Sequence, residues 1–350
     1  MISPELSDRS EFPDSTLQQL SNFKLAREKL SLVDTQISTL LKLLLLGMLT
    51  LIPDVVEESG ILEDSKHLET TTSLLRYQVA LNDWLDFSLS RRTDIQSALL
   101  LAANSENSAY HEATGLLSQT CSPKQIELVQ QSLKEITTIE VWAATKQDWT
   151  LAEAIEYRNL VNAVSNVLLT TVTLKFPQNL VEKLESDSAQ SSMDDIRTKY
   201  SWILQNQFEN RLEQTVLIMH NLAMAGQIDD DKFGQTVDGA LNLHSVALVA
   251  QQKIQDPAKM KQVLDQLKNQ YLETAQKLGL SSIAVRGIDF AQSQVIQKPM
   301  AWMTHSRESN TSIWRNGMLR RAQMGYWPFQ KSGQKTSVGL RERLYVAREI

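Results

Sequence analysis

The chain has 350 residues, 12 glycines, 8 prolines and a formal net charge of −6. Because an all-β fold needs a turn about every ten residues, so few glycines and prolines argue against one and favour helices. The single cysteine, Cys121, excludes an intrachain disulfide and a zinc site made of cysteines.

Residues 1–14 contain Pro4 and Pro13 and are predicted to be a loose leader. They lack the basic and apolar regions of a secretory signal, so a cytoplasmic location is the default expectation. Leaderless secretion is equally compatible with this sequence. A helical pattern begins at Ser15, with Gln18 three residues later as a weak capping box.

Residues 37–52 are apolar on all sides, and Pro53 follows them. Because this run holds 16 residues and includes Lys42, it is shorter than the roughly 20 apolar residues that cross a bilayer. A helix buried among other helices is therefore the first interpretation. The alternative is a helix that is held in a soluble bundle and later inserts into a membrane through Leu40, Leu43, Leu44, Leu45, Leu46 and Leu49.

Between residues 61 and 225 the only helix breakers are Gly115, Pro123 and Pro177, which permits long helices. We expect a helical segment over 64–113 that residues 104–108 interrupt. Ser122 and Pro123 then predict a helix start, and the following apolar residues show a coiled-coil spacing for only two heptads. The β-branched run 164–176 allows a short strand, but we prefer a helix there.

Apolar residues recur every four positions from Tyr200 to Val216, which predicts one amphipathic helix from about 200 to Gly226. Gly226 to Gly239 holds three glycines beside the run Asp229, Asp230 and Asp231, and we expect a hairpin turn there. A further helix is predicted to start at Asp256 as its N-cap, with Pro257 in the first position, and to stop at Gly279.

The segment that starts at Asp229 partly resembles a calcium-binding EF-hand loop, since Asp229, Asp231 and Gly234 occupy its first, third and sixth positions. Positions five and twelve are Phe233 and Ala240, so two required ligands are missing. We therefore expect an acidic turn and no metal.

Other catalytic patterns are weak. Asp194 and Asp195 would suit a helical enzyme of the terpene-cyclase kind, but such a site needs a carboxylate at Thr198. The five histidines include no pair at helical spacing, although His220 and His244 flank the expected hairpin. Cys121 precedes a helix start, which favours a low pKa, but it has no identified base. We expect no cofactor, and an all-helical enzyme is the weakest of our functional hypotheses.

Residues 299–350 differ in character from the rest, because they hold nine Lys or Arg against three Asp or Glu, which leaves a net −12 for residues 1–298. Cations alternate with large rings, and the predicted partner-binding residues are Trp314, Arg315, Arg320, Arg321, Tyr326, Trp327 and Lys331. This mixture suits a protein partner first, an anionic membrane second and nucleic acid third, since a six-charge excess is small for a nucleic-acid binder. The segment could also fold back on the acidic body.

The sequence therefore predicts an all-α fold: an elongated bundle with long helices over 15–298, followed by a basic, aromatic and less regular tail over 299–350. The first functional hypothesis is a non-enzymatic scaffold that binds another protein through its tail or exposed helix faces. The second is a membrane-acting helical protein, such as a subunit of a pore-forming toxin.

Overall fold

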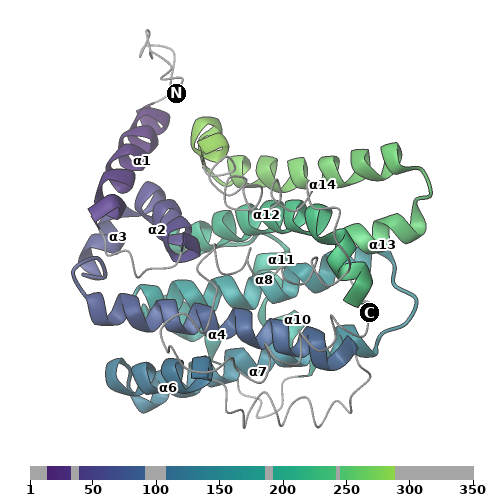
Figure 1. The fold of residues 1–350 in the computed structure, drawn as a ribbon. Helices are drawn as coiled ribbons and strands as arrows, with labels where there is room; N and C mark the ends of the chain where they lie inside the picture. Colours follow the sequence, from purple (N-terminus) through teal and green to yellow (C-terminus); the bar gives the residue numbers. More distant parts are fainter. Residues whose placement is uncertain (1–13, 33–38, 91–107, 186–191, 242–244, 288–350) are drawn as a thin grey trace.

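The computed structural model describes residues 14–32, 39–90, 108–185, 192–241 and 245–287 (Figure 1). Within these ranges the regular structure is helical and no strand occurs, which confirms the predicted all-α class. The helices are α1 Asp14–Leu32, α2 Thr39–Leu51, α3 Pro53–Glu58, α4 Ser65–Ser90, α6 Ser108–Thr120, α7 Pro123–Thr145, α8 Leu151–Thr173, α9 Gln178–Leu184, α10 Met193–Lys199, α11 Ser201–Leu204, α12 Arg211–Leu241, α13 Val246–Lys253 and α14 Pro257–Lys277.

The core is organised around α8 and α12. Helix α12 packs against α14, α8 and α13, and α4 packs against α6, α7 and α8. In Figure 1, α12 lies between α14 above it and α8 below it. The second half of α8 is buried at every residue from Asn166 to Thr173, so its side chains face neighbouring helices in several directions.

Helix starts follow the local cap chemistry. Ser122 accepts a hydrogen bond from the Gln125 backbone N–H, and the Gln125 side chain in turn accepts one from the Ser122 N–H, which completes a capping box at α7. Asp256 accepts hydrogen bonds from two backbone N–H groups in the first turn of α14. Gly279, at φ 110°, follows that helix. The predictions for these helix ends are confirmed.

The β-branched run 164–176 is helical as far as Thr173, so the alternative of a strand is wrong. Buried threonines in this run turn their hydroxyls back to the helix, as Thr171 Oγ1 does to the Val167 carbonyl at 2.7 Å. This hydrogen bond satisfies a polar group without a strand partner, and the surrounding packing outweighs the modest local preference.

The single helix expected from 200 to 226 is wrong. The chain forms α10 and α11, leaves helical structure over 205–210, and begins α12 at Arg211. Asn206 has φ 54°, and its side-chain oxygen accepts a hydrogen bond from Asn221 Nδ2. Asparagine adopts this left-handed conformation more readily than most residues, so the chain turns where the apolar spacing alone suggested continuity.

The hairpin expected over Gly226–Gly239 is also wrong, because α12 continues through it to Leu241. Glycine costs a helix only about 1 kcal/mol per residue, which packing can offset. Here Asp229 forms ion pairs with Lys232 and Lys268, and Asp231 accepts a hydrogen bond from the Val246 backbone N–H. These acids hold helices together and do not mark a turn.

Three predicted segments lie wholly or almost wholly outside the described residues: the leader 1–14, the interruption at 104–108 and the tail 299–350. The apolar helix α2 ends before Pro53 as expected, and Pro53 is also the first residue of α3.

Candidate functional site

The predicted partner-binding residues Trp314, Arg315, Arg320, Arg321, Tyr326, Trp327 and Lys331 all lie outside the described residues. The predicted membrane-inserting leucines belong to α2. Four of them are buried: Leu44, Leu45, Leu46 and Leu49. Leu43 is half-buried, and the side chain of Leu40 is not among those that the structure describes. Among the described helices, none combines the length and the apolar character that crossing a membrane requires.

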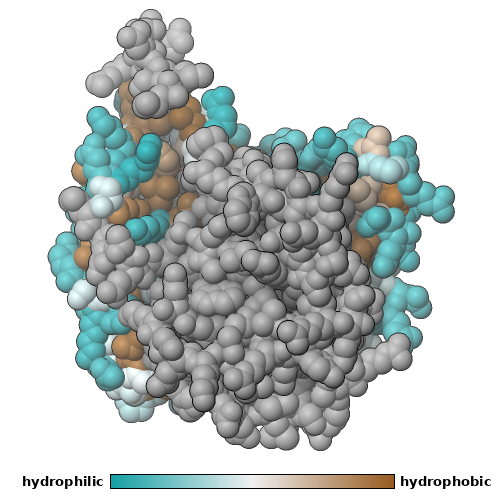
Figure 2. All heavy atoms as spheres, viewed as in Figure 1, coloured by the Kyte–Doolittle hydropathy of each residue, from teal (hydrophilic) through white to brown (hydrophobic). Residues whose placement is uncertain are grey.

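Helix α2 is enclosed chiefly by α1 and also contacts α12. Asn22 Nδ2 on α1 donates to the Thr50 carbonyl at 3.2 Å, and Lys29 pairs with Glu57 of α3. Hydrophobic residues are visible on the side of the molecule where α1 lies (Figure 2). Leu25, on α1, is 48% exposed. The main cover over α2 is thus α1, which is held partly by polar contacts, while α3, α4 and α12 contact α2 as well.

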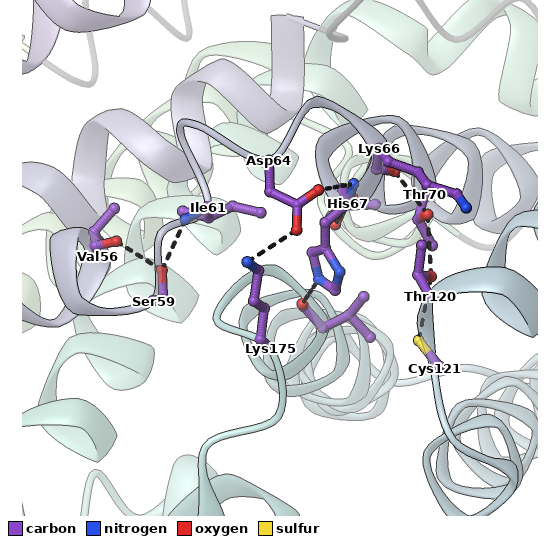
Figure 3. Close-up of polar contacts among 12 residues, drawn as sticks. Val56, Ser59, Ile61, Asp64, Lys66, His67, Thr70, Thr120, Cys121 and Lys175 are labelled. Carbon is purple, nitrogen blue, oxygen red and sulfur yellow. Dashed lines mark hydrogen bonds and ion pairs between the residues drawn. The ribbon is translucent and has the colours of Figure 1, made fainter.

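A polar cluster joins the start of α4 to the end of α8 (Figure 3). Asp64 accepts a hydrogen bond from the His67 backbone N–H at 3.0 Å and pairs with Lys175 Nζ at 3.0 Å. The imidazole of His67 lies 2.6 Å, through Nε2, from the Val172 carbonyl. Since a carbonyl only accepts, Nε2 carries the proton and donates.

The charges and protonation states in this cluster favour a structural role, in which the cluster holds α4 against the end of α8. Burial lowers the pKa of His67 below its usual 6.5, so the imidazole is neutral at pH 7. The His67 N–H and Lys175 lower the pKa of Asp64, which keeps the carboxylate charged. Lys175 and Phe176 both have left-handed φ angles, 57° and 62°, where α8 ends. The cluster therefore fixes a strained helix end against α4.

Cys121 does not have the activated character that a helix start suggested. Burial raises the pKa of its thiol above the usual 9.0. Its sulfur lies 3.6 Å from Thr120 Oγ1, and among the described residues no acid or histidine contacts the thiol. The N-terminal backbone of α7 is instead capped by Ser122. A thiol with a raised pKa is a poor nucleophile at neutral pH.

His220 sits in a buried hydrogen-bonded chain that crosses three helices. Its Nε2 lies 3.1 Å from Asn159 Oδ1 on α8, and Asn159 Nδ2 donates to the Tyr271 hydroxyl on α14 at 2.8 Å. Burial lowers the pKa of His220 to about 4, so it is neutral at pH 7. His244, which flanks the other end of the expected hairpin, lies outside the described residues.

Asp229 of the EF-hand-like stretch forms ion pairs within α12 and with α14, and Asp231 pairs with Arg158 of α8. Lys268 Nζ lies 2.6 Å from Asp229 Oδ2, and Lys232 bridges Asp229 and Asp265. Because these residues lie on a continuous helix, they do not form a calcium loop. Across the part of the chain that the structure describes, no group of three His, Cys, Asp or Glu side chains could hold a metal ion.

The pair at Asp194 and Asp195 has a similar structural use. Asp195 completes a capping box with Ser192 at the start of α10, and Asp194 pairs with Arg197 at 2.8 Å. Arg197 also pairs with Glu156 of α8 at 2.7 Å, so Asp194 shares a cation and Asp195 caps a helix.

Sequence reasoning missed the buried carboxylates of Glu135, Glu140 and Glu213, of which Glu135 is the least exposed. Glu135 on α7 is 1% exposed, accepts a hydrogen bond from Tyr200 at 2.8 Å and pairs with Lys199 at 2.7 Å. The two helices α7 and α10 are thus joined by a satisfied carboxylate. The sequence carried only a weak signal, a glutamate one residue from the apolar Ile136 on a predicted helix.

The loop 205–210 presents an aromatic side chain to solvent on a well-held backbone. Phe208 is 44% exposed. On one side of it the Gln207 N–H donates to the Trp202 carbonyl at 2.8 Å, and on the other the Glu209 N–H donates to Glu213 Oε2 at 2.8 Å. Such an arrangement can bind another surface with little ordering of its own backbone.

Comparisons with known proteins give no relative for this chain. No family model matches it, no curated protein matches it, and no solved structure matches its fold.

Proposed function

We propose that this protein is a non-enzymatic helical scaffold that binds another protein through its tail, residues 299–350, and through exposed helix faces of its body. One observation carries the proposal: a basic, ring-rich tail with an excess of six positive charges follows a body with a net charge of −12. Rings and arginines are the side chains that contribute most to protein interfaces.

The described body supports a scaffold in a second way. Several polar side chains of the body join one helix to another: His67 binds the end of α8, His220 is hydrogen-bonded to Asn159, and Asp229 pairs with two lysines. Hydrogen bonds and ion pairs of this kind rigidify a bundle. A rigid body is what a scaffold requires in order to present a binding segment.

Comparing the full chain with a variant that lacks residues 299–350 tests this proposal. We expect the full chain to bind its partner saturably, and a peptide of residues 299–350 to compete with it. The truncated variant should lose binding while its far-ultraviolet circular dichroism stays helical. Equal binding by both proteins would refute a docking tail, and loss of helical signal would show that the tail is part of the fold.

The second candidate is a membrane-acting protein that inserts α2. The observation in its favour is that α2 is apolar on all sides and is covered chiefly by α1. Release of dye from liposomes tests this candidate, with zwitterionic vesicles as the control for anionic ones. Absence of leakage from both kinds of vesicle would remove it.

A further inference from the structure

The loop that carries the exposed Phe208 leads into a contact with α3, although about 150 residues separate the two in sequence. Arg211, three residues after Phe208, pairs with Asp54 at 3.0 Å and donates from Nη2 to the Leu51 carbonyl at 2.6 Å. Phe208 precedes Arg211 by three residues, so at most about 11 Å of backbone separates it from the residue that contacts α3. The loop and the helix are therefore neighbours at the surface, joined by the Arg211 side chain.

The charge of this surface is negative. Glu58 lies one helical turn after Asp54 on the same face of α3, and Glu209 is adjacent to Phe208. All three carboxylates are exposed, and Arg211 is bound to Asp54. This part of the surface therefore combines one exposed ring with three exposed carboxylates and one arginine. We call Phe208, Glu209, Asp54 and Glu58 the Phe208 surface.

We propose that the Phe208 surface binds the basic, aromatic tail of the same chain, residues 299–350. The chemistry is complementary, since the tail offers arginines to the carboxylates, and rings and guanidinium planes to Phe208. This inference rests on the proposed function in that the tail is the binding segment. It adds that an external partner must displace the tail from the Phe208 surface.

The covalent connection makes such binding feasible even if the contact is weak. The 26 residues between Gly287, where the described chain ends, and Trp314 can span up to about 90 Å, which exceeds the size of a body of this length. A tethered segment has an effective concentration on the order of 1 mM. A dissociation constant near 0.1 mM would then keep the tail bound about nine-tenths of the time.

Limited digestion of the full-length protein with chymotrypsin tests the inference. This protease cuts after large rings such as Trp314 and Tyr326, so substitutions of charged residues neither create nor remove a cleavage site in the tail. We expect the variant Phe208→Ala/Glu58→Lys/Glu209→Lys to be cut in the tail about tenfold faster than the wild type. High salt should accelerate cutting of the wild type but not of this variant, because salt screens exposed charges. The matched control Glu127→Lys/Glu273→Lys reverses two exposed acids on α7 and α14 and should be cut at the wild-type rate.

A charge exchange completes the test. Adding Arg320→Glu/Arg321→Glu to Glu58→Lys/Glu209→Lys should restore slow cutting, whereas either pair alone should not. Equal cutting of the wild type and the Phe208 surface variants, with unchanged melting temperatures, would overturn the inference. Protection that disappears on dilution would assign the surface to the tail of a second copy and would equally overturn it. Because no external partner is needed, this outcome is independent of the binding test of the proposed function.

Discussion

The contact between α2 and α12 predicts an unusual response to a glycine-to-alanine substitution. Gly47 on α2 faces Met219 on α12, and a Cβ at position 47 would lie 2.7 Å from Met219 Cε and closer still to its sulfur. Ordinary contacts between such atoms are about 3.5–4.0 Å. Gly47→Ala therefore requires Met219 or the helix to move.

Two terms set the size of the effect. Replacing glycine by alanine inside a helix stabilises it by about 1 kcal/mol. Forcing an extra methyl group into a packed core costs roughly 1–3 kcal/mol. Met219 is only 6% exposed, so it has no solvent to move into and the cost should lie in the upper part of that range. We expect Gly47→Ala to lower the free energy of unfolding by about 1 kcal/mol.

Gly115 provides a matched control for the same substitution. It lies within α6, and a Cβ at this position would meet nothing within 4 Å. Gly115→Ala should therefore raise the free energy of unfolding by about 1 kcal/mol, so that the two alanine variants differ by about 2 kcal/mol.

Urea unfolding followed by circular dichroism measures the free energy of unfolding of both variants. The comparison requires that the dependence of this free energy on urea concentration be the same for the two proteins. In a double-mutant cycle, Met219→Ala should remove most of the cost of Gly47→Ala, because the shorter side chain leaves room for the methyl group. If Gly47→Ala stabilised the protein as much as Gly115→Ala does, the described packing of α2 against α12 would be refuted.

Three further variants test the polar contacts. Burial lowers the pKa of His220 from 6.5 to about 4, so the unfolded chain binds a proton between these values that the folded protein excludes. The free energy of unfolding should thus fall as the pH drops from 6.5 to 4, and His220 should contribute roughly 3 kcal/mol of that fall. Urea titrations at both pH values should show a smaller fall in His220→Gln than in the wild type. Asp256→Ala removes the cap of α14 and should cost about 1 kcal/mol, whereas Glu273→Ala on the same helix should change the melting temperature little. Asp231→Ala leaves the buried Val246 N–H without an acceptor and should cost about 2–3 kcal/mol in the same urea assay; a loss below 0.5 kcal/mol would contradict the assigned hydrogen bond.

Helix ends could be predicted from the sequence where a cap is local. Ser122 with Pro123, and Asp256 with Pro257, place the donor, acceptor and fixed φ angle within four residues, and both helices start there. The break at 205–210 could not be predicted this way. The turn at Asn206 is stabilised by Asn221, on the next helix, while the apolar spacing runs through the loop unchanged.

The polar contacts between helices could not be predicted from the sequence either, because they join residues that are far apart in the chain. His67 meets the Val172 carbonyl across 105 positions, and Asn159 meets Tyr271 across 112. No periodicity relates residues so far apart. The glycines of α12 gave a misleading signal, since packing between α8 and α14 offsets a penalty that would favour a turn in an isolated peptide.

The packing of α2 also limits how a membrane role could operate. Its buried leucines are Leu41, Leu44, Leu45, Leu46 and Leu49. Burial of one leucine side chain contributes about 1.5–3 kcal/mol, so these five contribute roughly 7–15 kcal/mol. That is comparable with the whole stability of a typical domain, about 5–15 kcal/mol. Exposing α2 to water would therefore unfold much of the body, and a membrane-acting mechanism requires α2 to pass from the bundle directly into lipid. In that case α1, which covers it, would have to contact the bilayer first.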